Sequence, residues 1–220
     1  MLTSLAYDEE SIPTTDRHHM TAGDIRDLFL ETSHSFATAA QSDYPATVAA
    51  AIELLSTAFE TGHKLLVFGN GGSASDAEHI SGELVGRFLL ERAGLPAICL
   101  TSNAAFVTAW ANDCGYEQIF SRQIQALGVP GDVAWGISTS GNSKNVVAGL
   151  KTARAAGLRT IGMTGASGGN LTTICDVLLA APATSTPRVQ EIHLVTYHAM
   201  CEAVERVKIQ SAASLNELAR

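Results

Sequence analysis

The sequence contains no apolar run long enough to cross a membrane. Its 220 residues are 46% hydrophobic, but Gly, Ser, Asn and charged residues interrupt each apolar stretch well before the roughly 18 residues that a membrane-spanning helix needs. The N-terminus carries Asp8, Glu9 and Glu10 where a secretory signal would place positive charge and then an apolar core. We therefore expect a protein that is not exported, has no membrane partner and is cytoplasmic.

Clusters of basic residues are also absent. The chain has 14 Lys and Arg residues against 22 Asp and Glu residues, which gives a net charge of −8 and an isoelectric point near 5.3. Proteins that bind the nucleic-acid backbone neutralise its phosphates with Lys and Arg. We therefore expect no nucleic-acid partner.

The four cysteines show no CxxC spacing. Cys99, Cys114, Cys175 and Cys201 are scattered inside apolar patterns, which is typical of reduced packing residues in the cytoplasm. We expect no thiol-based function.

The composition indicates one folded domain. Only 16% of the residues are charged and the mean hydropathy is +0.14, which is too apolar for intrinsic disorder and implies a large buried core. Residues 1–20 are polar, contain Pro13 and have neither helical nor strand periodicity, so they are predicted to be a flexible tail. Residues 21–220 show no repeat, low-complexity tract or linker and are predicted to form a single domain.

The periodicity predicts an α/β fold. Between residues 22 and 61, apolar residues recur at three- and four-residue steps, which predicts two helices with Tyr44-Pro45 between them. Short apolar runs, loops of Gly, Ser and Asn, and helical stretches then alternate, as in βα units that build a parallel sheet. The predicted strands are residues 64–68, 97–100, 132–137, 159–163 and 177–179, and a last helix covers roughly residues 188–210.

The turn after the first predicted strand has the composition of a phosphate-binding loop. Residues 69–75 read GNGGSAS and precede a helix expected to begin near Asp76. Small residues at a strand-to-helix turn let backbone N–H groups and the helix N-terminus approach an anion. The string also satisfies the dinucleotide pattern G-x-G-x-x-A, but the second strand ends in LTSN, with no carboxylate for a ribose hydroxyl.

A second turn of this kind follows the third predicted strand. Residues 137–143 read ISTSGNS, with hydroxyls at Ser138, Thr139, Ser140 and Ser143. Hydroxyls donate hydrogen bonds to phosphate oxygens without adding charge. Two such loops at adjacent strand ends favour a sugar phosphate as ligand. The alternative is that Ser, Gly and Asn only fill turns and cap helices.

Two helices carry candidate ligands or acid–base groups. His79 and Glu83 are four residues apart and so share one helix face, where they can bind a metal or act as a proton-transfer pair. They also fit an ordinary polar helix surface. The last helix offers Gln190, Glu191, His193 and His198. Spacing does not choose among these four, although His193 and His198, about 140° apart, should not share a site.

The segments GNGGSASDAEH, ISTSGNS and RVQEIH together resemble the sugar isomerase (SIS) domain family, and within it the phosphoheptose isomerases, over residues 22–210. The resemblance implies a three-layer α/β sandwich with a five-stranded parallel sheet of flavodoxin-like type, plus N-terminal helices. It implies a homotetramer with active sites at subunit interfaces. It also implies an aldose–ketose isomerase that converts sedoheptulose 7-phosphate, through an enediol, into a D-glycero-D-manno (or altro) heptose 7-phosphate used as a nucleotide-heptose precursor.

The resemblance assigns roles to individual residues. Glu83 is the implied base and His198 its acid–base partner, and one Zn²⁺ per subunit is bound by His79, Glu83, Gln190 and His198. Because a ligating carboxylate is a weaker base, the sequence leaves open whether Glu83 and His198 bind zinc, transfer protons or do both. The wide spacing of Gln190 and His198 leaves open whether one chain or two supply the ligands. The implied substrate contacts are Asn70, Gly71, Gly72, Ser73, Asn112, Asp113, Ser138, Thr139, Ser140, Ser143 and Gln190.

Some positions leave alternatives open. Asn112 and Asp113 fit a helix C-terminus before Gly115 as well as a substrate contact. Pro187 stands where some phosphoheptose isomerases carry an acidic residue, whose task is vacant here or falls to Thr184, Ser185 or Thr186. The second functional class is a non-catalytic SIS-domain regulator that binds a sugar phosphate or a replication initiator. That branch carries Asn in place of His198 and Arg in place of Ser140, so both residues favour the enzyme.

Overall fold

A computed structural model describes residues 19–218 of the chain, with side chains described up to residue 210. The tail predicted for residues 1–20 lies almost wholly outside the described residues. Over the part that is described, no helix has both the length and the apolar character needed to cross a bilayer.

Five short strands form one parallel sheet. They are β1 (Leu65–Gly69), β2 (Ala97–Cys99), β3 (Val133–Ile137), β4 (Arg159–Gly165) and β5 (Val177–Ala181). The strand order is β2-β1-β3-β4-β5 and every neighbouring pair is parallel, which is the flavodoxin-like order. The predicted fold class is confirmed. The predicted strands lie within two residues of the observed ones because each apolar run marks a strand covered on both faces.

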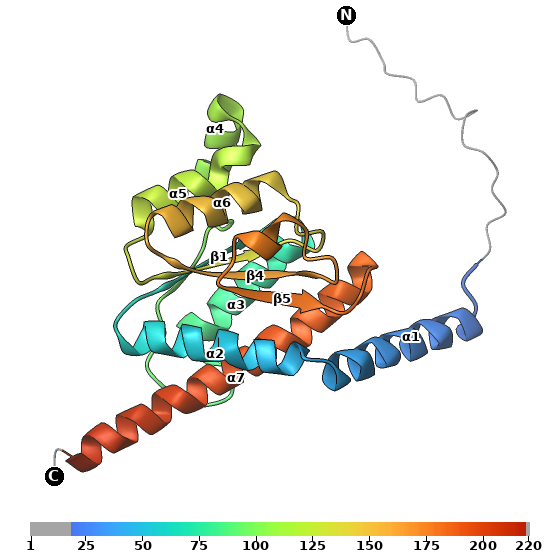
Figure 1. Ribbon diagram of the computed structural model, residues 1–220, viewed down its shortest axis with the longest axis horizontal. Helices are drawn as coiled ribbons and strands as arrows, with labels where there is room; N and C mark the ends of the chain where they lie inside the picture. Colours follow the sequence, from blue (N-terminus) through green and yellow to red (C-terminus); the bar gives the residue numbers. More distant parts are fainter. Residues whose placement is uncertain (1–18, 219–220) are drawn as a thin grey trace, which may run out of the picture.

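Helices cover both faces of the sheet (Figure 1). Side chains of alternate strand residues, such as Leu65 and Val67, pack with α2 (Tyr44–Glu60), α3 (Gly72–Val85) and α7 (Thr186–Leu218). Leu66 and Phe68 point to the other face and pack with α5 (Ile119–Leu127) and α6 (Lys144–Ala155). The period of two in a strand therefore divides the core into two layers, giving the three-layer sandwich.

The two N-terminal helices separate earlier than predicted. Helix α1 (Ala22–Gln41) starts at a capping box formed by Thr21 and Asp24 and extends away from the sandwich (Figure 1). The break lies at residues 42–43, so the prediction that Tyr44-Pro45 separates the helices was wrong. Tyr44 and Pro45 begin α2 instead, because a proline in the first helical turn has a suitable φ and loses no intrahelical hydrogen bond.

Helix α3 also begins earlier than the predicted start near Asp76. Gly71 has a φ of +56°, a conformation that favours glycine, and it turns the chain so that the Ser73 N–H bonds the Asn70 carbonyl at 3.0 Å. Gly72 and Ser73 therefore lie in the first helical turn and not in a loop. Helix α7 extends the predicted last helix at both ends and has Pro187 in its first turn, a position that suits proline.

The remaining elements complete the layer that contains α5 and α6. Helix α4 (Ala104–Cys114) stands out from the sandwich (Figure 1), and all of its residues are at least partly exposed. Two short 3-10 helices, η2 (Tyr116–Gln118) and η3 (Gly169–Thr173), follow α4 and β4. All four cysteines are free, and burial raises the pKa of Cys175 and Cys201 to about 12, so these two thiols remain protonated near neutral pH.

Candidate active site

The two predicted anion-binding loops meet at one edge of the sheet. Strands β1 and β3 are neighbours with Gly69 opposite Ile137, so the segments that follow them start side by side. The side-chain amides of Asn70 and Asn145 exchange two hydrogen bonds of 2.9 and 2.8 Å. The hydroxyl of Tyr116 donates a third, of 2.9 Å, to Oδ1 of Asn70. This network fixes the Asn70 side chain against α6.

Gln190 lies beside the first loop. A Cβ atom on Gly72 would collide with Nε2 of Gln190, so the glycine allows α7 to approach the start of α3. A shallow pocket of about 360 Å³ is lined there by Gly72, Asp76, Pro187, Gln190, Glu191 and Leu194. The pocket that contains Pro187 therefore holds two carboxyl groups, while Thr184, Ser185 and Thr186 do not line it.

Ser138 is the buried centre of the second loop. Its Oγ donates to Oγ of Ser143 at 2.9 Å, accepts the Ser143 N–H at 3.4 Å and lies 3.5 Å from Oγ of Ser140. The Thr139 carbonyl accepts the Gly165 N–H at 2.9 Å, which ties the loop to the end of β4. The loop is thus fixed by its backbone and by Ser138, and the Ser140 hydroxyl is exposed at its tip.

Helices α3 and α7 bring the predicted catalytic residues together. His79 Nε2 lies 2.9 Å from Oε1 of Glu83, and His79 Nδ1 lies 3.0 Å from the hydroxyl of Tyr197. The rings of His79 and His198 meet edge to face with centroids 5.1 Å apart. Burial and the neighbouring His79 charge hold the pKa of His198 below its usual value, while Glu83 acts in the opposite direction. The lowered pKa favours the neutral ring, which has one N–H that can donate a proton and one nitrogen that can accept one.

His79, Glu83 and His198 offer donor atoms of the types that zinc binds in proteins. Two imidazoles and a carboxylate are a common catalytic zinc set, and the Tyr197 hydroxyl on Nδ1 of His79 orients the ring so that Nε2 faces the cluster. Gln190 lies about 12 Å from His198 along the axis of α7. Among residues 19–210, no three His, Cys, Asp or Glu side chains surround a common point. His79, Glu83 and His198 therefore match zinc by donor type, although their side chains do not converge on one point, and Gln190 lines the neighbouring pocket with Gly72 and Asp76.

Asn112 and Asp113 lie on the last turn of α4, both exposed. The Asn112 amide donates to Oδ1 of Asp113 at 2.9 Å, and the helix ends at Gly115, whose φ is +95°. The helix C-terminus that the sequence offered as one alternative is therefore present. The part of the chain that the structure describes shows no contact between this pair and the cluster of His79, Glu83 and His198.

Sequence reasoning missed Asp76 and Tyr197. Burial raises the pKa of Asp76 to about 6, against the hydrogen bond from Tyr197 and the charge of His79. Its Oδ2 atom is buried without a hydrogen-bond partner among the described residues. Asp76 could have been found, because it stands three residues before His79 on the same helix face. Nothing in the sequence indicates the contact of Tyr197 with His79, which depends on how α7 packs on α3.

Comparisons of sequence and of structure with known proteins find the same family. Residues 29–165 match the SIS domain model. The chain is 51% identical to a phosphoheptose isomerase from Trichlorobacter lovleyi over 76% of this chain and 85% of that protein, and 55% identical to one from Geotalea daltonii over 72% and 83%. A solved phosphoheptose isomerase from Francisella tularensis superposes with a TM-score of 0.81 at 34% identity, covering 85% of this chain and all of that one.

Proposed function

The chain belongs to the phosphoheptose isomerase family of SIS-domain proteins, and from that membership we propose that it is an aldose–ketose isomerase acting on a sugar phosphate in heptose biosynthesis. The substrate is sedoheptulose 7-phosphate and the product a D-glycero-D-manno (or altro) heptose 7-phosphate. The observation that carries the proposal is the cluster of His79, Glu83 and His198 on α3 and α7, with the anion-binding turn at the start of the same helix α3.

The reaction needs one base and one acid. Glu83 removes a proton from C1 of the ketose while His198 gives a proton to the C2 carbonyl oxygen, which produces an enediol. Glu83 then returns the proton to C2, and His198 takes the hydroxyl proton from the oxygen on C1, which becomes the aldehyde. The sum is an isomerisation that consumes no other reactant.

Zinc is the proposed cofactor, one ion per subunit. His79, Glu83 and His198 would hold it, and Gln190 stays a predicted fourth ligand. When bound, the ion supplies positive charge that stabilises negative charge developing on substrate oxygen. The contact of Tyr197 with His79 supports this assignment because it holds the imidazole in one orientation.

A product assay tests the function directly. Purified protein is incubated with sedoheptulose 7-phosphate and, in parallel, with five- and six-carbon ketose phosphates, and the aldose products are measured. We expect turnover of the seven-carbon substrate and at least tenfold lower kcat/KM for the shorter ones. Absence of any aldose phosphate would contradict the isomerase assignment. Equal turnover of all three would contradict the assigned substrate.

The phosphate is proposed to bind at the two loops, through Asn70, Gly71, Gly72 and Ser73 on one side and Ser138, Thr139, Ser140 and Ser143 on the other. Replacing Ser140 and Ser143 with Ala together is expected to raise KM about tenfold and to lower kcat less than threefold. The hydroxyls bind a group that is the same in substrate and transition state. Steady-state kinetics with Ser102→Ala as the matched control would check this. An unchanged KM would place the phosphate elsewhere.

Removal of zinc is expected to lower activity. Dialysis against a chelator should reduce kcat at least tenfold, and added Zn²⁺ should restore it, because charge stabilisation by a metal is worth several kcal/mol. Metal analysis of freshly purified protein should give close to one zinc per chain. A protein that is fully active with a negligible zinc content would contradict the metal assignment.

The homotetramer with active sites at subunit interfaces is proposed from family membership, and the apolar surface supports burial between subunits. Phe29 and Leu30 on α1 are 72% and 61% exposed, and a groove of about 570 Å³ between α1, α2 and α7 is lined almost entirely by apolar side chains. Such a large apolar patch is typical of a protein interface. In a tetramer, Asn112 and Asp113 on the protruding helix α4 could meet the site of another subunit.

Charged side chains in place of Phe29 and Leu30 should prevent the proposed tetramer from forming. The double change Phe29→Glu and Leu30→Glu is expected to shift the mass measured by light scattering from a tetramer to a smaller species, because each interface would bury unpaired charge. Thr38→Glu, at an exposed position on another face of the same helix, is the control. A wild-type protein that is monomeric at micromolar concentration would contradict the proposed assembly.

A further inference from the structure

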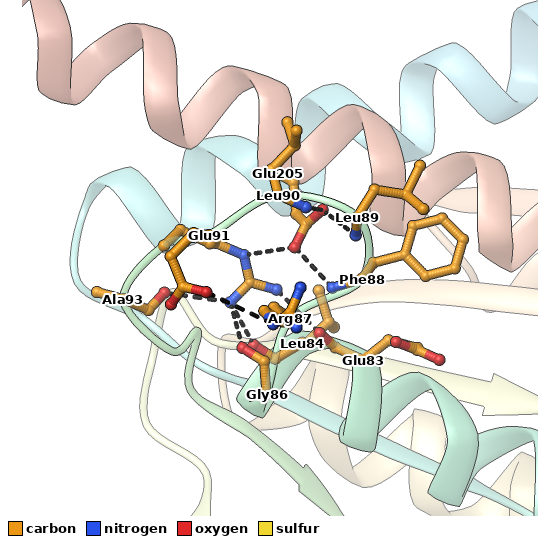
Figure 2. Close-up of polar contacts among 11 residues, drawn as sticks. Glu83, Leu84, Gly86, Arg87, Phe88, Leu89, Leu90, Glu91, Ala93 and Glu205 are labelled. Carbon is orange, nitrogen blue, oxygen red and sulfur yellow. Dashed lines mark hydrogen bonds and ion pairs between the residues drawn. The ribbon is translucent and has the colours of Figure 1, made fainter.

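The segment between α3 and β2 is held by one buried carboxylate of α7, as Figure 2 shows. Glu205 is fully buried and accepts the backbone N–H groups of Phe88, Leu89 and Leu90 at 2.7, 2.8 and 3.0 Å. Its Oε1 also lies 3.1 Å from Nε of Arg92, which is almost fully buried. A segment without regular structure is thereby fixed to the last helix at four points.

Arg92 links the same carboxylate to the end of α3. Its guanidinium donates to the carbonyls of Glu83 and Leu84 at 2.9 and 2.8 Å, and to those of Gly86 and Ala93 at 3.1 Å each. The last carbonyls of a helix have no intrahelical partner, so Arg92 completes the turn of α3 that carries Glu83.

Phe88 links the carboxylate to His198. The Phe88 ring stacks on the His198 ring with centroids 5.3 Å apart and 27° between the planes, while its backbone N–H is bound to Glu205. Glu205 follows His198 by seven residues, which places both on one face of α7 about 10 Å apart. Glu205 is thus one residue away from each member of the proposed proton-transfer pair. Phe88 lies between Glu205 and His198, and Arg92 lies between Glu205 and the backbone of Glu83.

Stability alone does not account for this ion pair. Replacing a buried ion pair with apolar side chains of similar volume is often neutral or stabilising, because removing two charges from water is costly. Burial would raise the pKa of Glu205, but the three backbone N–H groups and the charge of Arg92 hold it below its usual value. The carboxylate is therefore charged near neutral pH, where it can hold all four of its contacts.

We propose that Glu205 is a positioning residue of the isomerase site, which orients the His198 ring through Phe88 and the end of α3 with Glu83 through Arg92. The inference rests on the proposed function in so far as it takes Glu83 and His198 as the proton-transfer pair. Glu205 itself touches neither reacting atoms nor substrate.

The test compares three variants. Glu205→Gln keeps the size of the side chain but removes its charge, and Phe88→Leu keeps an apolar contact but removes the ring. Glu202→Gln is the control, since Glu202 is half-buried one turn earlier on α7 and pairs with Arg206 instead. With sedoheptulose 7-phosphate, we expect the first two variants to lower kcat at least tenfold with KM within threefold of wild type. The double variant should lose less than the product of the two single losses, because the Phe88 contact is one of the two routes through which Glu205 acts.

A second readout needs no substrate. In protein labelled with ¹³C on histidine, the ring protons of His198, assigned with a His198→Gln variant, should lie upfield because the Phe88 ring stacks on them. Glu205→Gln and Phe88→Leu should move them downfield, and Glu202→Gln should leave them in place. Circular dichroism gives the folded fraction to which each kcat is referred. If Glu205→Gln fails to fold, Phe88→Leu carries both measurements.

The outcomes separate the two proposals. A wild-type protein that does not turn over the ketose phosphate contradicts the proposed function, while the His198 signals still test the positioning contact. Signals that move without a loss of kcat, or a kcat that falls while the signals stay in place, overturn the positioning role. A lower melting temperature with wild-type kcat and wild-type signals would show that Glu205 acts on stability alone.

Discussion

Glu83→Gln is expected to lower kcat about a thousandfold and to leave the fold intact. General base catalysis contributes typically 10²- to 10⁴-fold, and an amide cannot accept the carbon-bound proton. The amide oxygen can still accept a hydrogen bond from His79, which lies 2.9 Å from the carboxylate now. Initial rates with sedoheptulose 7-phosphate measure the loss, and Glu78→Gln, at an exposed position on the same helix, is the matched control.

Exchange of the transferred proton with deuterium from the solvent tests directly whether Glu83 is the base. A reaction through an enediol in D₂O should place deuterium at C2 of the aldose to the extent that the base exchanges its proton with solvent. Glu83→Gln should abolish the exchange together with turnover, while Glu78→Gln should retain both. Wild-type rates of exchange in Glu83→Gln would assign the base to another residue, and Asp76 would be the first to examine because burial raises its pKa to about 6.

Acid is expected to destabilise the folded protein through His193. The side chain is fully buried, its Nε2 lies 3.1 Å from the Thr164 carbonyl, and its Nδ1 has no hydrogen-bond partner among the described residues. Burial lowers the pKa of His193 to about 4, although the Thr164 carbonyl acts in the opposite direction. The unfolded chain binds this proton below about pH 6.5. The contribution of neutral His193 to the free energy of unfolding is therefore fully present above pH 6.5. It falls by up to about 3 kcal/mol as the pH falls toward 4.

A glutamine at this position should remove that dependence. In His193→Gln the amide can still donate to Thr164 but does not titrate, so the loss of unfolding free energy between pH 7 and pH 4.5 should be about 2.5 kcal/mol smaller than in wild type. Urea denaturation at both pH values measures the difference, and His34→Gln on the exposed side of α1 is the control. Equal losses of unfolding free energy in wild type and His193→Gln would mean that His193 binds a proton in the folded protein as readily as in the unfolded chain.

The sheet could be predicted from the sequence because its signal is local. A strand buried on both faces must be apolar at nearly every position, so the runs around Leu65, Val133 and Arg159 marked β1, β3 and β4. The start of α3 was missed because it depends on the positive φ of Gly71, which several glycines of the same turn could have adopted. The break before α2 was missed because Pro45 is equally compatible with a linker and with a first helical turn.

The site was predictable only in part for a similar reason. The hydroxyls and glycines of the two loops lie within a few residues of each other, and the chemistry of each loop follows from its own segment. The contacts around His198 depend instead on the rotation of α7 against α3 and on a segment without regular structure, which places Phe88 on the ring. Tyr197 and Glu205 carry no local signal, because an aromatic or an acid on a long helix is usually an ordinary surface or core residue.

Helix α3 carries Gly72 in its first turn and Glu83 in its last turn, so the helix fixes the distance between these two residues. Eleven residues separate Gly72 from Glu83, a rise of about 16 Å that no loop can stretch or shorten. Inserting one residue between them would turn Glu83 by about 100° away from His79 as well as moving it. A change in the length of α3 that keeps Glu83 facing His79 must therefore add or remove about one whole turn, a step of about 5 Å.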